Sequence, residues 1–227
     1  MRRVTPTVLL APLLTALLAA VTLSGAGCAS AGIAIREGFG IAKREQLVDR
    51  VEDARDSQEA AKEQFNSALD EFMSVTNQAG KAGELEARYK KLNAAYDKSV
   101  SKAETVRTRI ASVETVGGKL FDEWQAELNE YTDERLRTQS EQQLNDSRAR
   151  YAQLVTVMKA AEGKMTPVLD ALRNQVLFLK HNLNAQAIAG LQGTALEIQN
   201  DLSELIREME TSIAEANRFI DEMTPPS

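Results

Sequence analysis

The most regular feature of the chain is a seven-residue repeat of apolar side chains that begins at Leu47. Its members alternate at spacings of four and three, which places them on one stripe of a helix. The first stripe comprises Leu47, Val51, Ala54, Gln58, Ala61, Phe65, Ala68, Phe72 and Val75. We expect this stripe to form a coiled-coil seam in which the polar Gln58 fixes the register, with the helix ending near Gly80.

A second stripe follows the turn predicted at Gly80-Lys81-Ala82-Gly83. One row holds Leu85, Leu92, Ser99, Val106, Val113 and Leu120, and the other holds Tyr89, Tyr96, Ala103, Ile110, Gly117 and Trp124. At ~1.5 Å per residue, these rows predict a rod of roughly 60 Å or longer. We expect Trp124 to pack in the core, and we interpret Gly117-Gly118 as a local weakening of the helix.

A third helix is predicted to begin at Thr138-Gln139-Ser140-Glu141, which matches a capping box. Its seam row comprises Leu144, Tyr151, Met158, Met165, Leu172 and Leu179. The row keeps its interval across Pro167, which favours one kinked helix over two separate helices. Residues 176–179 are all apolar, so we expect neighbouring helices to surround this part.

The repeat changes phase between Leu183 and Ile188, which predicts a turn or a stutter near Asn184. The last stripe comprises Leu191, Ala195, Ile198, Leu202, Leu205, Met209, Ser212, Ala216 and Phe219. The predicted fold is all-α, an elongated antiparallel bundle or coiled coil of three to four long helices, with a two-helix extension at one end. If the third helix ran on through Asn184, the fold would be a three-helix spectrin-like rod.

The N-terminal residues have the character of an export signal. Arg2 and Arg3 precede a mostly apolar run over residues 8–23, which is shorter than a membrane-spanning helix usually requires. The predicted organisation is therefore a signal peptide over residues 1–27, a tether and linker over 28–42, a single coiled-coil bundle over 43–222 and a tail over 223–227.

The only cysteine of the chain, Cys28, directly follows the small residues of the signal. We expect cleavage after Gly27 and lipid attachment to Cys28, although Gly25 stands where lipoprotein signals usually have leucine. A thioether-linked cysteine cannot form a disulfide in the oxidising space outside the cytoplasm. Ala29 predicts the outer membrane, with the protein facing the periplasm. The alternatives are ordinary secretion, with Cys28 free or removed, and an uncleaved anchor.

Composition narrows the possible chemistry. Without Arg2 and Arg3, 25 basic residues face 33 acidic ones, a formal charge of −8, which disfavours nucleic-acid binding. His181 is the sole histidine, so metal sites built from several histidines or thiolates are disfavoured. We expect no cofactor and no enzymatic activity, and we interpret His181 as a helix-end residue rather than a catalytic base.

Four stretches carry a family resemblance: Gly40-Ile41-Ala42-Lys43-Arg44, L-V-D-R-V-E-D-A-R-D-S-Q over residues 47–58, F-D-E-W over 121–124 and Q-V-L-F-L-K-H-N-L-N-A-Q-A-I over 175–188. They resemble a family of bacterial envelope proteins of unknown function, many of them predicted lipoproteins with coiled-coil helices. The resemblance implies the helical fold and the envelope location. It implies no catalytic residue, ligand or partner.

These observations predict a lipid-anchored, non-enzymatic structural spacer or adaptor for another envelope protein. A homo-oligomer is also compatible with the heptads. The alternative is a ligand-binding bundle or enzyme centred on the apolar residues near Phe178. In that case the nearby polar groups would be Gln175, Lys180, His181 and Asn184.

Overall fold

The computed structural model describes residues 43–76 and 82–224, and it shows no strand within them. The elements are α2 (Lys43–Thr76), α3 (Ala82–Glu127), the 3-10 helix η1 (Leu128–Glu130), α4 (Glu134–His181), α5 (Ala185–Gly190) and α6 (Gln192–Met223). The predicted all-α class is confirmed. The signal, the tether and the helix end predicted near Gly80 lie outside the described residues.

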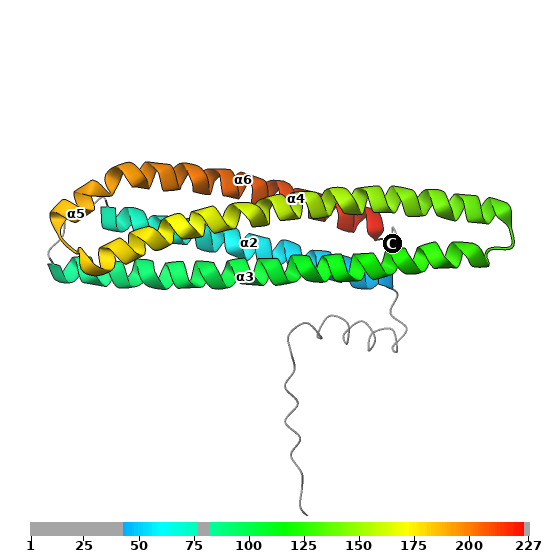
Figure 1. Ribbon diagram of the computed structural model, residues 1–227, viewed down its shortest axis with the longest axis horizontal. Coiled ribbons are helices and arrows are strands. Elements are labelled where there is room, and N and C mark those ends of the chain that lie inside the picture. The colour runs from blue at the N-terminus through cyan, green and yellow to red at the C-terminus, as the bar shows by residue number, and fades with distance from the viewer. Residues whose placement is uncertain (1–42, 77–81, 225–227) are drawn as a thin grey trace, which may run out of the picture.

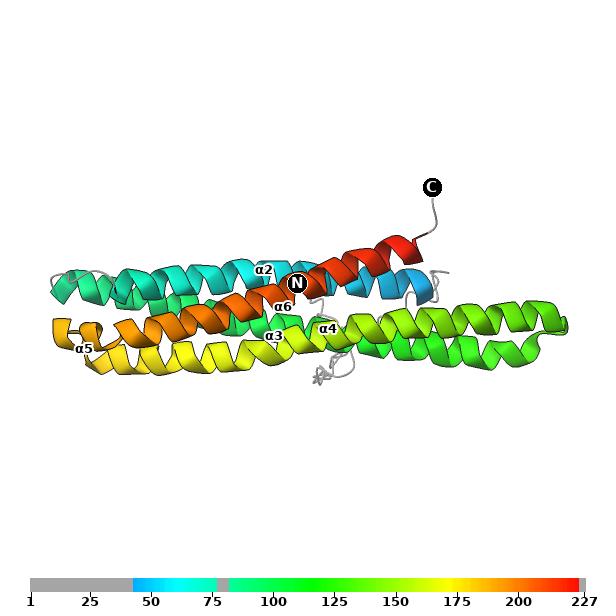
Figure 2. The same cartoon turned by 90° about the horizontal axis from the view of Figure 1, so that it is seen from above.

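The four long helices lie side by side with alternating directions and form a rod (Figures 1 and 2). Helix α2 packs against α3 and α6, and α4 packs against the same two helices, so each long helix has two long neighbours. This is the predicted up-down-up-down arrangement. At ~1.5 Å per residue, the 48-residue helix α4 alone is about 70 Å long.

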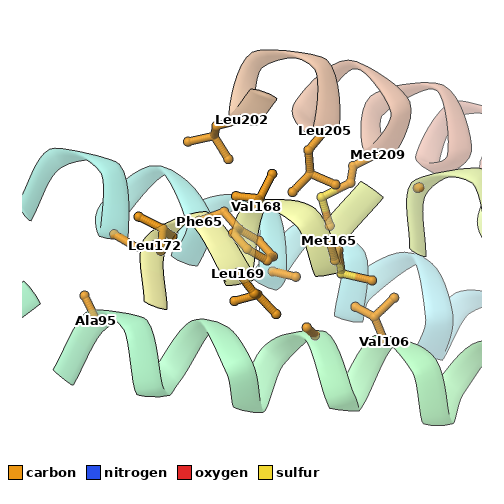
Figure 3. Packing of buried hydrophobic residues seen from close by; sticks show 14 of the residues in the cluster. Phe65, Ala95, Val106, Met165, Val168, Leu169, Leu172, Leu202, Leu205 and Met209 are labelled. Carbon is orange, nitrogen blue, oxygen red and sulfur yellow. The ribbon is translucent and has the colours of Figure 1, made fainter. Parts of the chain in front are cut away.

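The core runs lengthwise between the four helices. Every residue of the first and last predicted stripes is buried, including the polar Gln58 and Ser212. Midway along the rod, Phe65 of α2 lies among Val168 and Leu169 of α4 and Leu205 of α6 (Figure 3). Burying a side chain of this size contributes about 1.5–3 kcal/mol to folding, so the seam drives the assembly.

Helix α4 runs without interruption through Pro167, as the unbroken row of heptad residues predicts. Proline lacks the N–H that would bond to the carbonyl four residues earlier, at Gly163. Both Pro167 and Gly163 are exposed, so that carbonyl is on the outer side of the rod, where water can satisfy it.

The predicted start of this helix at Thr138 is wrong, because α4 begins at Glu134. The carboxylate of Asp133 accepts hydrogen bonds from the backbone N–H groups of Arg135 (2.9 Å) and Leu136 (3.4 Å), which makes Asp133 the cap. The Thr138 hydroxyl donates to the Glu134 carbonyl, and Ser140 is buried. The residues of the apparent capping box therefore lie inside the helix.

The chain turns near Asn184, as predicted. Helix α4 ends at His181, and the Asn184 side chain caps α5 by accepting a hydrogen bond of 2.9 Å from the Ala187 N–H. Helix α6 then returns along the rod. The described residues form four long helices, so the three-helix alternative is wrong.

Residues 176–179 are not surrounded by neighbouring helices, which corrects the prediction. Val176 and Leu179 are buried, whereas Leu177 is 49% exposed and Phe178 is 42% exposed. The reason is that α4 meets its long neighbours, α3 and α6, along one side only. A single stripe of this segment faces the core, and the intervening apolar residues face outward.

Helices α3 and α4 continue past the start of α2 and the end of α6, and this two-helix extension was predicted (Figure 1). We call residues 121–148 the arm. Its small core contains Phe121, Leu128 and Leu144, with Trp124 and Tyr151 packed against them. The rings of Phe121 and Tyr151 are 5.1 Å apart between centroids, tilted by 59°. The arm therefore has its own small core, and Tyr151 packs against both this core and the main cluster.

Candidate functional site

A hollow of about 480 Å³, which we call the notch, lies where the four-helix section becomes the two-helix arm. Its outline follows from helix lengths, because α2 begins and α6 ends beside it. Six of its lining residues are Lys43 and Arg44 from α2, Leu120 and Trp124 from α3, Ser147 from α4 and Met223 from α6. The notch thus exposes the face of α3 and α4 that α2 and α6 cover elsewhere.

Three contacts tie the ends of the two shorter helices to their neighbours around the notch. The Lys43 Nζ lies 2.5 Å from Glu123, and Arg150 Nη1 lies 3.2 Å from Glu222. The Arg44 guanidinium donates a hydrogen bond to the Met223 carbonyl. Exposed ion pairs each contribute about 0.2–1 kcal/mol, so these contacts fix the outline of the notch more than they stabilise the fold.

Two carboxylates on the arm side of the notch have no counterion among the described residues. Glu127 and Asp146 are exposed, and neither has a hydrogen bond or ion pair with any residue in the described ranges. The acidic residues that line the notch therefore outnumber the basic ones. This side of the notch favours a cationic group.

Trp124 is the only tryptophan of the chain, and it is half-buried at the notch. Its indole N–H donates a hydrogen bond of 2.8 Å to the Ser140 hydroxyl across the arm. This bond satisfies the one polar atom of the ring and leaves its apolar surface to pack with neighbours. Trp124 packs against the small core of the arm, as expected, but it is only half-buried, and the hollow beside it was missed.

Packing at the base of the arm also explains why residue 117 is a glycine. A Cβ atom on Gly117 would lie 2.4 Å from carbon atoms of the Tyr151 ring, so glycine here makes room for that ring. The Tyr151 hydroxyl donates a hydrogen bond of 3.3 Å to the Val113 carbonyl. Burial, and secondly the negative charge of Glu114, raise the pKa of Tyr151 to about 12.

The four residues predicted to lie near a ligand are at the opposite end of the rod from the arm. Gln175 is half-buried, Lys180 and His181 are exposed in the last turn of α4, and Asn184 caps α5. None of them lines the notch. The position of His181 at the end of a helix agrees with its interpretation from sequence.

The predicted lipid-attachment residue Cys28 and the cleavage site after Gly27 lie outside the described residues. Among the helices that the structure describes, none is both long and apolar enough to cross a membrane. Within residues 43–76 and 82–224, no group of three histidine, cysteine, aspartate or glutamate residues could hold a metal ion.

The described fold defines a class, the elongated antiparallel four-helix bundles, here with a two-helix arm. The sequence matches the family described as "Protein of unknown function (DUF2959)" over residues 33–223, and the chain belongs to that family. The predicted membership of an uncharacterised family is therefore confirmed. No curated protein and no solved structure matches the chain. The family match begins at residue 33, before the first residue of α2.

Proposed function

We propose that this protein is a lipid-anchored spacer or adaptor of the bacterial cell envelope, with no enzymatic activity. Cys28 would hold it in the outer membrane, and the bundle would face the periplasm and contact another envelope protein. The basic and apolar export signal, followed by a sole cysteine, supports the anchor. The long bundle supports the role of spacer.

One observation carries the adaptor role: the exposed large apolar side chains gather at the two ends of the rod. Tyr131 and Leu136 lie at the tip of the arm, and Leu177, Phe178 and Leu196 lie at the opposite end. Along the sides of the rod, Val100 is the only exposed large apolar residue among the described residues. Exposed apolar residues are where protein contacts form, so the ends are the favoured contact points.

The sides of the rod have the character of a solvated surface. Ion pairs there join neighbouring helices, such as Lys164 with Glu204 at 2.7 Å and Lys159 with Glu114 at 2.8 Å. Paired charges along the sides keep the rod soluble without offering a broad apolar surface. This division between solvated sides and apolar ends is expected of a rod that holds two partners apart.

The anchor is tested by the Cys28→Ser variant of the full-length protein in cells. We expect loss of labelling by radioactive palmitate and release from the membrane fraction, because no acyl chain remains. The matched control is Ser30→Ala, which changes a neighbouring small residue and should leave both readouts intact. Unchanged labelling of Cys28→Ser would overturn the anchor.

The adaptor role is tested by a photo-crosslinking amino acid placed at single positions in living cells. We expect one discrete protein adduct from Tyr131 or Leu136, or from Leu177 or Phe178. The exposed side-face residue Lys102 is the control. Absence of adducts at both ends, or the same adducts at Lys102, would contradict specific contacts at the ends.

The alternative function, a ligand-binding bundle or enzyme near residues 175–184, has less support. Lys180, His181 and Asn184 are exposed, and the outward-facing Leu177 and Phe178 cannot line an interior site. Melting of the purified protein with envelope extract discriminates the two functions, because a ligand at 100 times its Kd stabilises the folded state by about 2.7 kcal/mol.

A further inference from the structure

The notch continues the four-helix core at a place where no helix of the described residues fills it. Along most of the rod, α2 and α6 cover the inward face of α3 and α4. At the notch that face continues through Leu120 and Trp124, but α2 has not yet begun and α6 has ended. Partly exposed apolar side chains therefore mark a surface on which another segment can pack.

Chain connectivity decides which segment is nearest. Lys43 lines the notch, and the residues before it are joined to it covalently. Residues 33–42 read I-A-I-R-E-G-F-G-I-A and combine apolar side chains with one arginine, Arg36, and one glutamate, Glu37. At ~3.3–3.6 Å per residue, Phe39 can reach about 14 Å and Arg36 about 25 Å from Lys43. The family match also includes this segment, since it starts at residue 33.

We propose that residues 33–42 dock in the notch of the same molecule, with Phe39 against Trp124 and Arg36 beside Glu127 and Asp146. Aromatic pairs of this kind add to the burial of apolar area, and the guanidinium supplies the cation that the two carboxylates lack. The docked segment would extend the four-helix section along the base of the arm.

A second copy of the chain is a poorer occupant of the notch. The arm of another molecule would bring its own Glu127 and Asp146, and like charges brought together in an interface oppose association. The attached segment is also always present at a high effective concentration. A separate molecule would have to bind the notch more tightly to compete with it. Charge and connectivity therefore favour residues 33–42.

Docking has a consequence that rests on the proposed lipid anchor. Residues 29–42 would separate the lipidated Cys28 from the rod, and docking of 33–42 would leave only 29–32 as a free tether. A shorter tether restricts the distance and tilt of the rod relative to the membrane. The docking itself needs no lipid, so it can be tested independently of the anchor.

The test uses Trp124 as its reporter, because the chain has no other tryptophan. Quenching of its fluorescence by acrylamide is measured on the full-length protein in detergent. We expect Phe39→Ser to raise the quenching constant about twofold and to shift the emission to longer wavelength, because one covered face of the indole becomes exposed. The control is Val100→Ser, which removes an exposed apolar side chain from the side of the rod and should change neither signal.

A charge-reversal cycle provides the second test. Arg36→Glu and Asp146→Arg should each raise the quenching of Trp124, and the double variant should restore the original value, because the pair is re-formed with opposite signs. Circular dichroism confirms that each variant keeps its helices. Additive effects in the double variant would overturn the pairing, and unchanged quenching in Phe39→Ser would overturn the docking.

Two further outcomes identify other occupants, and each overturns the proposal. If dilution of the unaltered protein exposes Trp124 to acrylamide, a second copy covers the notch. If Phe39→Ser has no effect and vesicles of phosphatidylethanolamine shield Trp124, a lipid surface covers it. Persistence of the Phe39→Ser effect in the Cys28→Ser background would support docking even if the proposed anchor fails.

Discussion

The Ser212 hydroxyl of α6 donates a hydrogen bond of 2.9 Å to the side-chain oxygen of Gln58 in α2, and both residues are 0% exposed. They lie on the seams of two adjacent helices, in different rows of the two stripes. The amide nitrogen of Gln58 has no hydrogen-bond partner among the described residues. One bond therefore links two helices inside an apolar core, while one buried donor is unsatisfied.

This pair predicts opposite effects for single and double substitutions. Ser212→Ala leaves the Gln58 amide wholly unpaired and should lower the free energy of unfolding by about 1–3 kcal/mol. Gln58→Leu combined with Ser212→Ala removes both polar groups and should unfold at a urea concentration no lower than the unaltered protein. A double variant that is less stable than Ser212→Ala would contradict this account.

Gly117 and Gly118 form a matched pair for testing close packing. A Cβ at residue 117 meets the Tyr151 ring, so Gly117→Ala should destabilise the protein by about 1–3 kcal/mol through overpacking. A Cβ at the exposed residue 118 meets nothing within 4 Å, so Gly118→Ala should stabilise by up to about 1 kcal/mol through helix propensity. Urea unfolding measures both, and equal effects would refute the steric explanation.

The heptad stripes predicted the helices well because a repeat of apolar residues records burial directly. Nine seam positions from Leu47 to Val75 and nine from Leu191 to Phe219 were assigned to the core on spacing alone, and all of them are buried. The phase jump at Asn184 also predicted the last turn. The spacing was enough to predict these buried positions because each long helix buries a single stripe of residues.

Short sequence signals gave wrong predictions at two places in α4. Thr138 and Glu141 matched a capping box, but Asp133 is an equally good cap and follows the turn directly. The apolar residues Leu177 and Phe178 suggested burial, yet which sides of α4 are covered depends on its neighbours. The start of α4 and the exposure of Leu177 and Phe178 both depend on how the helices pack together. The sequence pattern of a single helix does not contain that information.

The notch was missed for a similar reason. Its position depends on where α2 begins and α6 ends relative to α3 and α4, and these registers come from packing between helices. One signal was available: the second stripe continues to Leu120 and Trp124, beyond the residues that the first stripe can cover when the two helices are laid antiparallel. Aligning the lengths of the stripes would have indicated an uncovered face there.

Alkaline titration is predicted to weaken the fold through Tyr151. Its pKa is about 12 in the folded protein, above the ordinary value of 10, because burial and Glu114 disfavour the charged phenolate. The stabilisation is complete below pH 10 and is lost as the pH rises from 10 to 12. Ultraviolet absorbance should show a late tyrosine ionisation near pH 12, and Tyr151→Phe should abolish that late step. Retention of the late step would assign it to another tyrosine.

The arm should open more readily than the four-helix section. In the arm, α3 and α4 cover only each other, and the small cluster around Phe121, Leu128 and Leu144 is the core that holds them. Further along the same helix, residues 158–172 of α4 pack in the main core, where α6 joins α3 as a neighbour. Local opening costs less free energy where fewer apolar contacts are lost.

Hydrogen exchange measured by mass spectrometry tests this within a single helix. Backbone amides of residues 138–147 should exchange before those of residues 158–172, although both segments belong to one helix and the second contains Pro167, which has no amide hydrogen. Leu144→Ala should speed exchange further in the arm while leaving residues 158–172 protected, because it removes a fully buried side chain from the arm's own cluster. Simultaneous exchange of both segments would mean that the arm and the four-helix section unfold as one unit, so that the arm could not move independently of the rod.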